Sequence, residues 1–229
     1  MFKEVLSEKA QGLIDKIAGQ VSNFYLAGGT GLALQLGHRV SEDLDLFSEK
    51  SFDAKEIEAV IAPEKVISVR PQTLHCVKDG IRLSFLFYDV PLCYPVQIWR
   101  GLHVAAWQDI VAEKIKTVSQ RGSKKDFWDV YSVIALRSSI DEVGELFLER
   151  FKGTGINLYY VLKSMVYFED ADKEPDPVLL ANGKKSDWER IKQFFEANIK
   201  EFEKVLMTRK RGVTPQINTL CCHFVNLTG

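Results

Sequence analysis

The sequence predicts an α+β protein, in which a mixed sheet with flanking helices is followed by a helical C-terminal half. Short alternating or wholly apolar runs, which are typical of strands, are confined to residues 24–88, and an Asp-Gly pair at 79–80 is a hairpin signal between two of them. From residue 107 onward, apolar residues recur at helical spacing. We therefore expect an α/β core at residues 1–101 and a helical region at residues 102–207 that completes a cleft. Residues 208–229 lack a periodic pattern, which is typical of a poorly ordered tail.

The composition is that of an ordinary globular protein, with 46% hydrophobic and 27% charged residues in 229. The net charge of −1 excludes the overall basic field of histone-like nucleic-acid binders, but it does not exclude a local basic patch. No run of 18 apolar residues occurs, and charged residues stand where a signal peptide needs an apolar region, so we expect a cytoplasmic protein without a membrane contact. The four cysteines lack C-x-x-C spacing, which disfavours structural zinc and a disulfide framework.

Each element of the first half has its own signal. A wholly apolar run at 24–27 ends at a glycine-rich turn, residues 43–47 alternate between polar and apolar, and Asp53 followed by Glu56 is typical of a helix start. We expect strands at residues 24–27, 43–47, 65–70, 73–78 and 81–88. We expect helices at residues 6–21, 32–37 and 53–61.

The second half carries three apolar stripes at helical spacing. They predict helices over residues 107–118 and 127–134, and a long helix after the capping signal Ser186-x-x-Glu189. Two prolines at 175 and 177 mark the loop before that helix.

The strand at 43–47 carries two carboxylates on one face. Asp43 and Asp45 are two residues apart, so both project to the same side while Leu44 and Leu46 face the core. Two like charges at this spacing repel each other unless a cation lies between them, and Mg²⁺ prefers such oxygen ligands together with substrate phosphates. The alternative is a pair of solvated carboxylates on an exposed sheet face.

The turn Gly28-Gly29-Thr30 lies between a predicted strand and a predicted helix. Glycines there allow backbone N–H groups to approach a phosphate, and the helix N-terminus adds positive potential. Thr30 can cap the helix or donate its hydroxyl to a phosphate. A tight strand-to-helix turn without a ligand explains the same residues.

Three further charged residues each allow two interpretations. Lys114 lies on the apolar stripe of its helix, so it either extends to solvent or points into a cleft; on either interpretation we expect Lys114→Ala to leave folding nearly unchanged. Asp126 fits a Ser123-x-x-Asp126 helix cap, with Asp129 one turn later as a partner for Lys125.

Arg39 could bind a phosphate through its planar guanidinium, or it could pair with Glu42 or Asp43.

Taken together, these residues resemble a known family. The run FYLAGGTGLALQLGHRVSEDLDLF at residues 24–47 resembles the signature of the AbiEii/AbiGii-type nucleotidyltransferases, which belong to the polymerase β-like superfamily and include toxins of type IV toxin–antitoxin systems. The run DIVAEKIKTVSQRGSKKDFWDVYSVI at 109–134 resembles the later motif of that family, and VYFEDADKEPDP at 166–177 is a softer match. The resemblance covers most of residues 20–206.

The resemblance implies a fold, a reaction and a set of site residues. It implies a polymerase β-like nucleotidyltransferase fold and a Mg²⁺- or Mn²⁺-dependent enzyme that uses a nucleoside triphosphate, with RNA, including tRNA, as a candidate acceptor and an antitoxin as a candidate partner. The resemblance implies a phosphate-binding turn at Gly28, Gly29 and Thr30 and a metal-binding pair at Asp43 and Asp45. It implies that Lys114 contacts the triphosphate and that Asp126 is a catalytic carboxylate. His38, Arg39 and Ser41 match positions that flank the metal strand, and the implied place of Arg39 and Ser41 is near the nucleotide.

The sequence departs from the superfamily pattern at one position. A third carboxylate is expected on the strand at 81–88, and Ser84 stands there instead. This leaves open a protein that binds nucleotide without transferring it, and a protein whose main task is to bind a partner.

A basic rim for RNA is a further hypothesis, with ordinary solvated charge as its alternative. The rim would consist of Arg121, Lys124, Lys125, Arg209, Lys210 and Arg211.

Overall fold

The computed structural model describes residues 1–180 and 187–208. The predicted tail beyond Thr208 lies outside the described residues, and so do the expected capping residue Ser186 and the three basic residues at 209–211.

Seven strands form one mixed sheet in this part of the chain, in the order β3-β4-β5-β2-β1-β7-β6. β1 pairs with β7 and β2 pairs with β5 in parallel, and the other neighbouring strands are antiparallel. The predicted mixed sheet with flanking helices is therefore confirmed. The strands are β1 (Tyr25–Leu26), β2 (Leu44–Ser48), β3 (Lys65–Arg70), β4 (Thr73–Lys78), β5 (Ile81–Phe87), β6 (Gln97–Trp99) and β7 (Leu102–Val104).

The hairpin of β6 and β7 is absent from the sequence-based prediction. Each strand has three residues, which is too short for an alternating pattern to stand out. The turn between them is formed by Arg100 and Gly101, with φ of 51° and 78°. Our boundary after residue 101 lies inside this hairpin, so the sheet continues as far as Val104.

The described helices include one at each predicted place, together with α6, α7 and α8, which were not predicted individually. They are α1 (Glu8–Ile17), α2 (Gly28–Leu36), α3 (Ala54–Ile61), α4 (Trp107–Gln120), α5 (Lys124–Leu136), α6 (Ile140–Arg150), α7 (Leu158–Ser164), α8 (Glu169–Asp172) and α9 (Trp188–Thr208). Asp53 caps α3 as predicted, because its carboxylate accepts the N–H of Lys55 at 2.8 Å. The start of α9 is capped by Asp187, whose carboxylate accepts the N–H of Arg190 at 3.1 Å. None of the described helices is both long and apolar enough to span a membrane.

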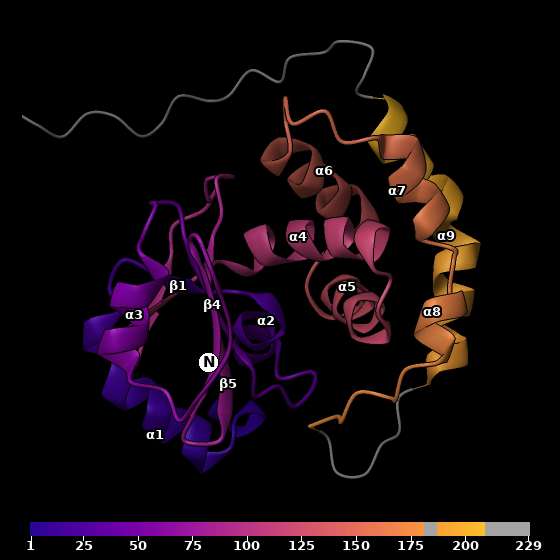
Figure 1. Ribbon diagram of the computed structural model, residues 1–229. Coiled ribbons are helices and arrows are strands. Elements are labelled where there is room, and N and C mark those ends of the chain that lie inside the picture. The colour runs from indigo at the N-terminus through magenta and orange to yellow at the C-terminus, as the bar shows by residue number, and fades with distance from the viewer. Residues whose placement is uncertain (181–186, 209–229) are drawn as a thin grey trace, which may run out of the picture.

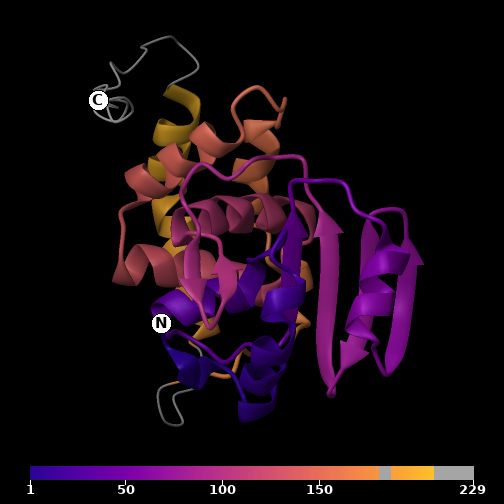
Figure 2. The same cartoon turned by 90° about the vertical axis from the view of Figure 1, so that its left-hand side faces the viewer.

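The two faces of the sheet have different covers. α1 and α3 lie on one side of the strands, and α2 and α4 lie on the other (Figure 1). The first face holds a buried core in which Leu44, Leu46 and Phe85 are fully enclosed. Figure 2 shows the long strands at one side of the molecule and the helical half at the other. The second sheet face is thus the one that meets the helical half.

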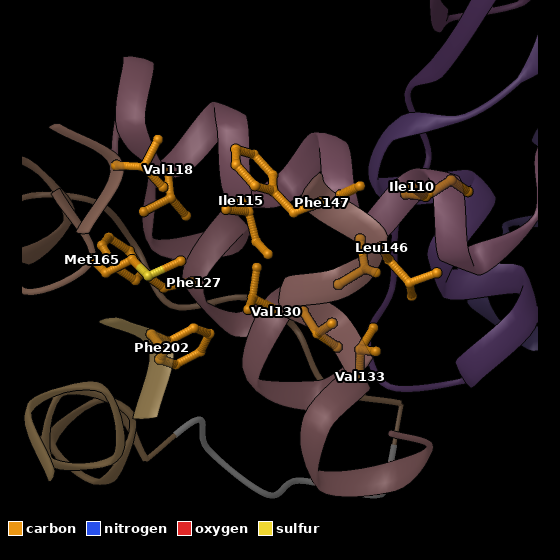
Figure 3. Close-up of a cluster of buried hydrophobic side chains, with 14 of the residues drawn as sticks. Ile110, Ile115, Val118, Phe127, Val130, Val133, Leu146, Phe147, Met165 and Phe202 are labelled. Carbon is orange, nitrogen blue, oxygen red and sulfur yellow. The ribbon is translucent and has the colours of Figure 1, made fainter. Parts of the chain in front are cut away.

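A second core fills the helical half. Side chains from α4, α5 and α6 point toward one another, with Met165 and Phe202 closing the cluster (Figure 3). α2 joins the two cores, because Leu32 and Leu36 pack in the helical cluster while Ala33 and Leu34 pack against the sheet. The helical half is therefore fixed against the sheet by a shared helix as well as by chain connectivity.

Candidate functional site

A pocket of about 450 Å³ lies between the second face of the sheet and α4. The alternation of the strands explains its floor, because every second residue of β2, β4 and β5 faces the first core and the intervening ones face the pocket. Floor residues from these strands are Asp45, Phe47, His75, Ser84 and Leu86. The α4 residues that line it include Ile110, Glu113, Lys114, Thr117 and Gln120, and the glycine turn contributes Gly28 and Gly29.

The glycine turn packs directly on Asp45. Gly28 has a φ of 60°, and a Cβ atom at this position would lie 2.7 Å from Asp45 Oδ2. A Cβ atom on Gly29 would collide with the guanidinium of Arg39. α2 begins at Gly28 and its first residues have no side-chain cap, so their N–H groups are available at the pocket edge. Glycine is therefore required here by close approach as well as by backbone conformation.

Thr30 and Ser41 are joined beneath this turn. The Thr30 hydroxyl lies 2.8 Å from Ser41 Oγ and donates to the carbonyl oxygen of Asp43 at 2.5 Å. These bonds hold the segment before β2 against the start of α2. Neither side chain lines the pocket, so their predicted contact with nucleotide stays a prediction.

The two carboxylates of the predicted metal pair differ in their surroundings. Asp45 lies on β2, is half-buried and lines the pocket, whereas Asp43 is exposed just before the strand begins. Leu44 and Leu46 face the core as predicted. Burial raises the pKa of Asp45, and the charge of Asp43 raises it further, against lowering by Ser84 and Lys114. A cation beside Asp45 would relieve both upward effects.

The donor set suits a hard divalent cation. Two carboxylates are the usual protein contribution to Mg²⁺, with phosphates and water as the other ligands. In the described ranges, no group of three or more His, Cys, Asp and Glu side chains is arranged to hold a metal ion. Two carboxylates do not complete the coordination of such an ion, so a metal at Asp43 and Asp45 would need further ligands such as phosphate oxygens.

Behind the pocket, a buried ion network joins the segment that follows α2 to α4 and α5. Asp129 accepts hydrogen bonds from Arg39 at 2.6 and 2.9 Å, and it lies 2.8 Å from His38 Nε2. Lys114 Nζ lies 2.6 Å from Asp129 Oδ2 and 2.7 Å from Asp126 Oδ1. Both aspartates have no exposed surface, so Lys114 is the ammonium that connects them.

The charges of this network stabilise one another. Burial alone would raise the pKa of Asp129, but Arg39 and Lys114 hold it well below its usual value. Burial alone would lower the pKa of Lys114, but the charges of Asp129 and Asp126 have the larger effect, so this pKa is raised. For His38, burial dominates over Asp129 and lowers the pKa, which favours the neutral imidazole.

Asp126 completes the network behind the pocket and does not itself line the pocket. Its carboxylate accepts hydrogen bonds from Arg121 at 2.8 and 3.1 Å in addition to that from Lys114. Burial raises its pKa, and Lys114 and Arg121 together lower it below the usual value. Asp126 therefore holds two cations that both line the pocket.

Several local expectations for these residues are wrong. Ser123 makes no side-chain cap to α5, and Asp129 pairs across the fold instead of with Lys125. Arg39 pairs with Asp129 instead of Glu42 or Asp43. The long-range partners win because a fully buried carboxylate needs buried cations, which a surface lysine cannot supply.

Two other lysine expectations also fail. Lys114 does not extend to solvent, since only 7% of its side chain is exposed. Lys124 fits neither the basic rim nor its alternative of solvated charge, because it is buried, pairs with Asp176 at 3.2 Å and lies over the Trp188 ring.

A second ion network also lines the pocket, and the two sequence motifs did not predict it. Arg150 on α6 contacts Asp109 and Glu113 on α4, each at 2.7 Å. The Tyr88 hydroxyl donates to Glu113 at 2.9 Å and accepts from Lys116 at 2.7 Å. The only sequence signal was Asp109 at the start of the second motif, and Arg150 lies 41 residues further along the chain.

Comparisons with known proteins agree with the resemblance carried by the motifs. A family model described as the nucleotidyl transferase AbiEii toxin of type IV toxin–antitoxin systems matches residues 16–95 and 94–208. The protein aq_aa25 of Aquifex aeolicus (strain VF5), described as uncharacterised, is 33% identical over 209 residues, which are 86% of this chain and 97% of that protein.

Two solved structures share the fold at low identity. JHP933 from Helicobacter pylori is 18% identical with a TM-score of 0.51, over 90% of this chain and 96% of that one. The nucleotidyltransferase toxin MenT4, Rv2826c from Mycobacterium tuberculosis H37Rv, is 16% identical with a TM-score of 0.52, over 89% of this chain and 90% of that one. These matches confirm the predicted nucleotidyltransferase fold.

Proposed function

The chain belongs to the AbiEii nucleotidyltransferase toxin family of type IV toxin–antitoxin systems, and from that premise we propose that it transfers a nucleotidyl group from a nucleoside triphosphate to an acceptor. The observation that carries the proposal is the contact between Gly28 and Asp45 at the edge of a pocket that Lys114 and Arg121 also line. This arrangement brings together backbone donors, a carboxylate and two cations. Phosphoryl transfer depends mainly on such positioning and charge neutralisation.

Three sets of groups would bind the triphosphate. The N–H groups of Gly28, Gly29 and Thr30 suit a phosphate at the start of α2. Lys114 uses two of the three N–H donors of its ammonium on Asp126 and Asp129, which leaves one for a phosphate oxygen. Arg121 extends from the same edge with its side chain 63% exposed.

Arg39 and Ser41 brace the phosphate-binding turn from below. Asp126 would act as a positioning residue, because it holds Lys114 and Arg121, and both of these cations line the pocket.

Asp43 and Asp45 would hold Mg²⁺ or Mn²⁺ together with the phosphates. When bound, the ion would neutralise triphosphate charge and favour displacement of pyrophosphate. The half-buried Asp45 would anchor this group, and the exposed Asp43 would complete the pair.

The acceptor and the partner follow from the family. RNA, with tRNA as the first candidate, is the proposed acceptor, and an antitoxin is the proposed protein partner in the cytoplasm. Arg121 and Lys125 are the exposed members of the predicted basic rim within the described ranges.

A second candidate function is nucleotide binding without transfer. Ser84 favours it, because this residue is the register partner of Asp45 on β5 and supplies a hydroxyl instead of a third carboxylate.

The test is transfer of label from α-phosphate-labelled nucleoside triphosphates to total tRNA, with pyrophosphate release measured in the same reaction. We expect Mg²⁺-dependent transfer by the wild type and a loss of roughly 10²-fold or more in Asp45→Asn. Glu42→Gln is the matched control, since Glu42 is an exposed acid in the same segment. Nucleotide binding without pyrophosphate release would favour the second candidate, and equal rates for wild type and Asp45→Asn would contradict the proposed site.

A further inference from the structure

We propose that His75 is the general base of the transfer reaction, oriented by Ser84 and, through Ser84, by Asp45. The inference rests on the proposed function for the reaction step, but its geometry is independent of that function. Neither motif at 24–47 or 109–134 includes His75 or Ser84.

The three side chains form a row across adjacent strands. Asp45 on β2 is the register partner of Ser84 on β5, and Ser84 is the register partner of His75 on β4. All three line the pocket. His75 Nδ1 lies 3.1 Å from Ser84 Oγ, and the Ser84 hydroxyl is near enough to the Asp45 carboxyl to lower its pKa.

The chemistry of the row sets the direction of its hydrogen bonds. An ionised carboxylate only accepts, so the Ser84 hydroxyl donates to Asp45. The Ser84 oxygen is then the acceptor for the N–H of His75 Nδ1. The proton of the neutral imidazole is thereby held on Nδ1, and Nε2 is left with a free electron pair. Such an imidazole can take up a proton at Nε2.

The other acidic groups of the pocket are already engaged. Glu113 and Asp109 are held by Arg150, and Asp45 is assigned to the metal. Among the described carboxylate and histidine side chains that line the pocket, Asp45 and His75 carry no ion pair, and Asp45 is assigned to the metal, which leaves His75 as the base. Asp109 and Glu113 differ from His75 because their charges balance Arg150.

The proton transfer completes a balanced step. The acceptor hydroxyl oxygen forms a bond to the α-phosphorus while the bond from that phosphorus to the β-phosphate bridging oxygen breaks, and pyrophosphate leaves with the electron pair. The hydroxyl proton moves to His75 Nε2, and the resulting imidazolium returns it to solvent after the product leaves. Ser84 and Asp45 keep their own protonation states throughout.

The tautomer of His75 can be measured without any reaction. In nitrogen NMR of the full chain, at a pH where the spectrum itself shows the neutral imidazole, we expect the His75 proton on Nδ1. The sequence has four histidines, so His75→Gln assigns the signal by its disappearance. Ser84→Ala removes the acceptor and is expected to move the proton to Nε2. A proton on Nε2 in the wild type would overturn the proposal.

Kinetics provide the second arm. With labelled triphosphate and total tRNA, we expect His75→Gln to lower kcat by roughly 10²-fold or more, with KM changed far less. The His75→Gln/Ser84→Ala variant should be no slower than His75→Gln alone, because Ser84 acts through His75. His103→Gln is the matched control, since His103 is a half-buried histidine of the same sheet outside the pocket.

The two arms separate this inference from the proposed function. A wild type with the expected tautomer but no transfer of any nucleotide would contradict the proposed function and leave the hydrogen-bonded row intact. A wild type that transfers nucleotide while His75→Gln keeps its kcat would retain the proposed function and overturn the role of His75.

Discussion

Replacing Lys114 by alanine should destabilise the fold as well as stop transfer. Asp126 and Asp129 are fully buried, and Lys114 is the cation that contacts both. Removing one partner of a buried ion pair costs about 3–5 kcal/mol. Arg39 and Arg121 still contact the two carboxylates, so we expect the lower end, about 3 kcal/mol. This corrects the sequence-based expectation that folding would hardly change.

The assay is denaturant unfolding of wild type, Lys114→Ala and Lys125→Ala. Lys125 is an exposed lysine near the start of α5 and its replacement should change the unfolding free energy by less than about 0.5 kcal/mol. For a chain of this size, 3 kcal/mol corresponds to a melting shift of roughly 6–12 °C.

The pH dependence gives the same prediction a second signature. The pKa values of Asp126 and Asp129 are lowered in the folded protein, so their contribution to stability is present above about pH 4 and is lost as the pH falls through the folded values. In Lys114→Ala the carboxylates gain by protonation, so the difference from wild type should shrink in acid. A loss below about 1 kcal/mol at pH 7, or a difference that does not depend on pH, would contradict the role of Lys114 as the buried ion partner of Asp126 and Asp129.

Three other substitutions test particular contacts. Gly28→Ala should lower the free energy of unfolding by about 1–2 kcal/mol and weaken triphosphate binding, because its φ is 60° and its Cβ would lie 2.7 Å from Asp45 Oδ2. Thermal shifts with and without triphosphate measure both effects. Gly12→Ala is the control and should not lower stability, because the space around Gly12 is open. Arg150→Met should cost about 3 kcal/mol by leaving the buried Asp109 unpaired, measured by urea unfolding against the exposed Lys152→Met; equal stability of the two would argue against this network. Asp126→Asn should abolish transfer and lower the free energy of unfolding by about 2 kcal/mol or more, because a buried charged hydrogen-bond acceptor is lost. This exceeds the effect of a charge at a helix terminus. A variant that melts early yet keeps its activity per folded molecule would remove Asp126 from the site.

Local patterns predicted the elements whose signal lies within a few residues. The hairpin at Asp79-Gly80 and the strands on either side of it were predicted within a residue, because alternation and turn chemistry are local. The approach of Gly28 to Asp45 was not predicted, because it depends on the antiparallel pairing of β1 with β2.

Patterns that depend on distant partners could not be read from the sequence. Local rules predicted that Asp129 pairs with Lys125 and that Asp126 belongs to a helix cap with Ser123. In the structure, the buried Asp129 pairs with Arg39, 90 residues away, and the buried Asp126 pairs with Lys114. The row of Asp45, Ser84 and His75 requires the strand order β4-β5-β2, which spacing alone does not fix. The same limit hid the contact between Arg150 and Asp109.

Magnesium-dependent binding of a non-hydrolysable nucleoside triphosphate analogue, measured by titration calorimetry, tests the central claim most directly. We expect one binding site in the wild type, an affinity at least about tenfold lower in Asp45→Asn, equivalent to about 1.4 kcal/mol, and no change in Glu42→Gln. Equal magnesium-dependent affinity in wild type and Asp45→Asn, or no binding by the wild type, would contradict it.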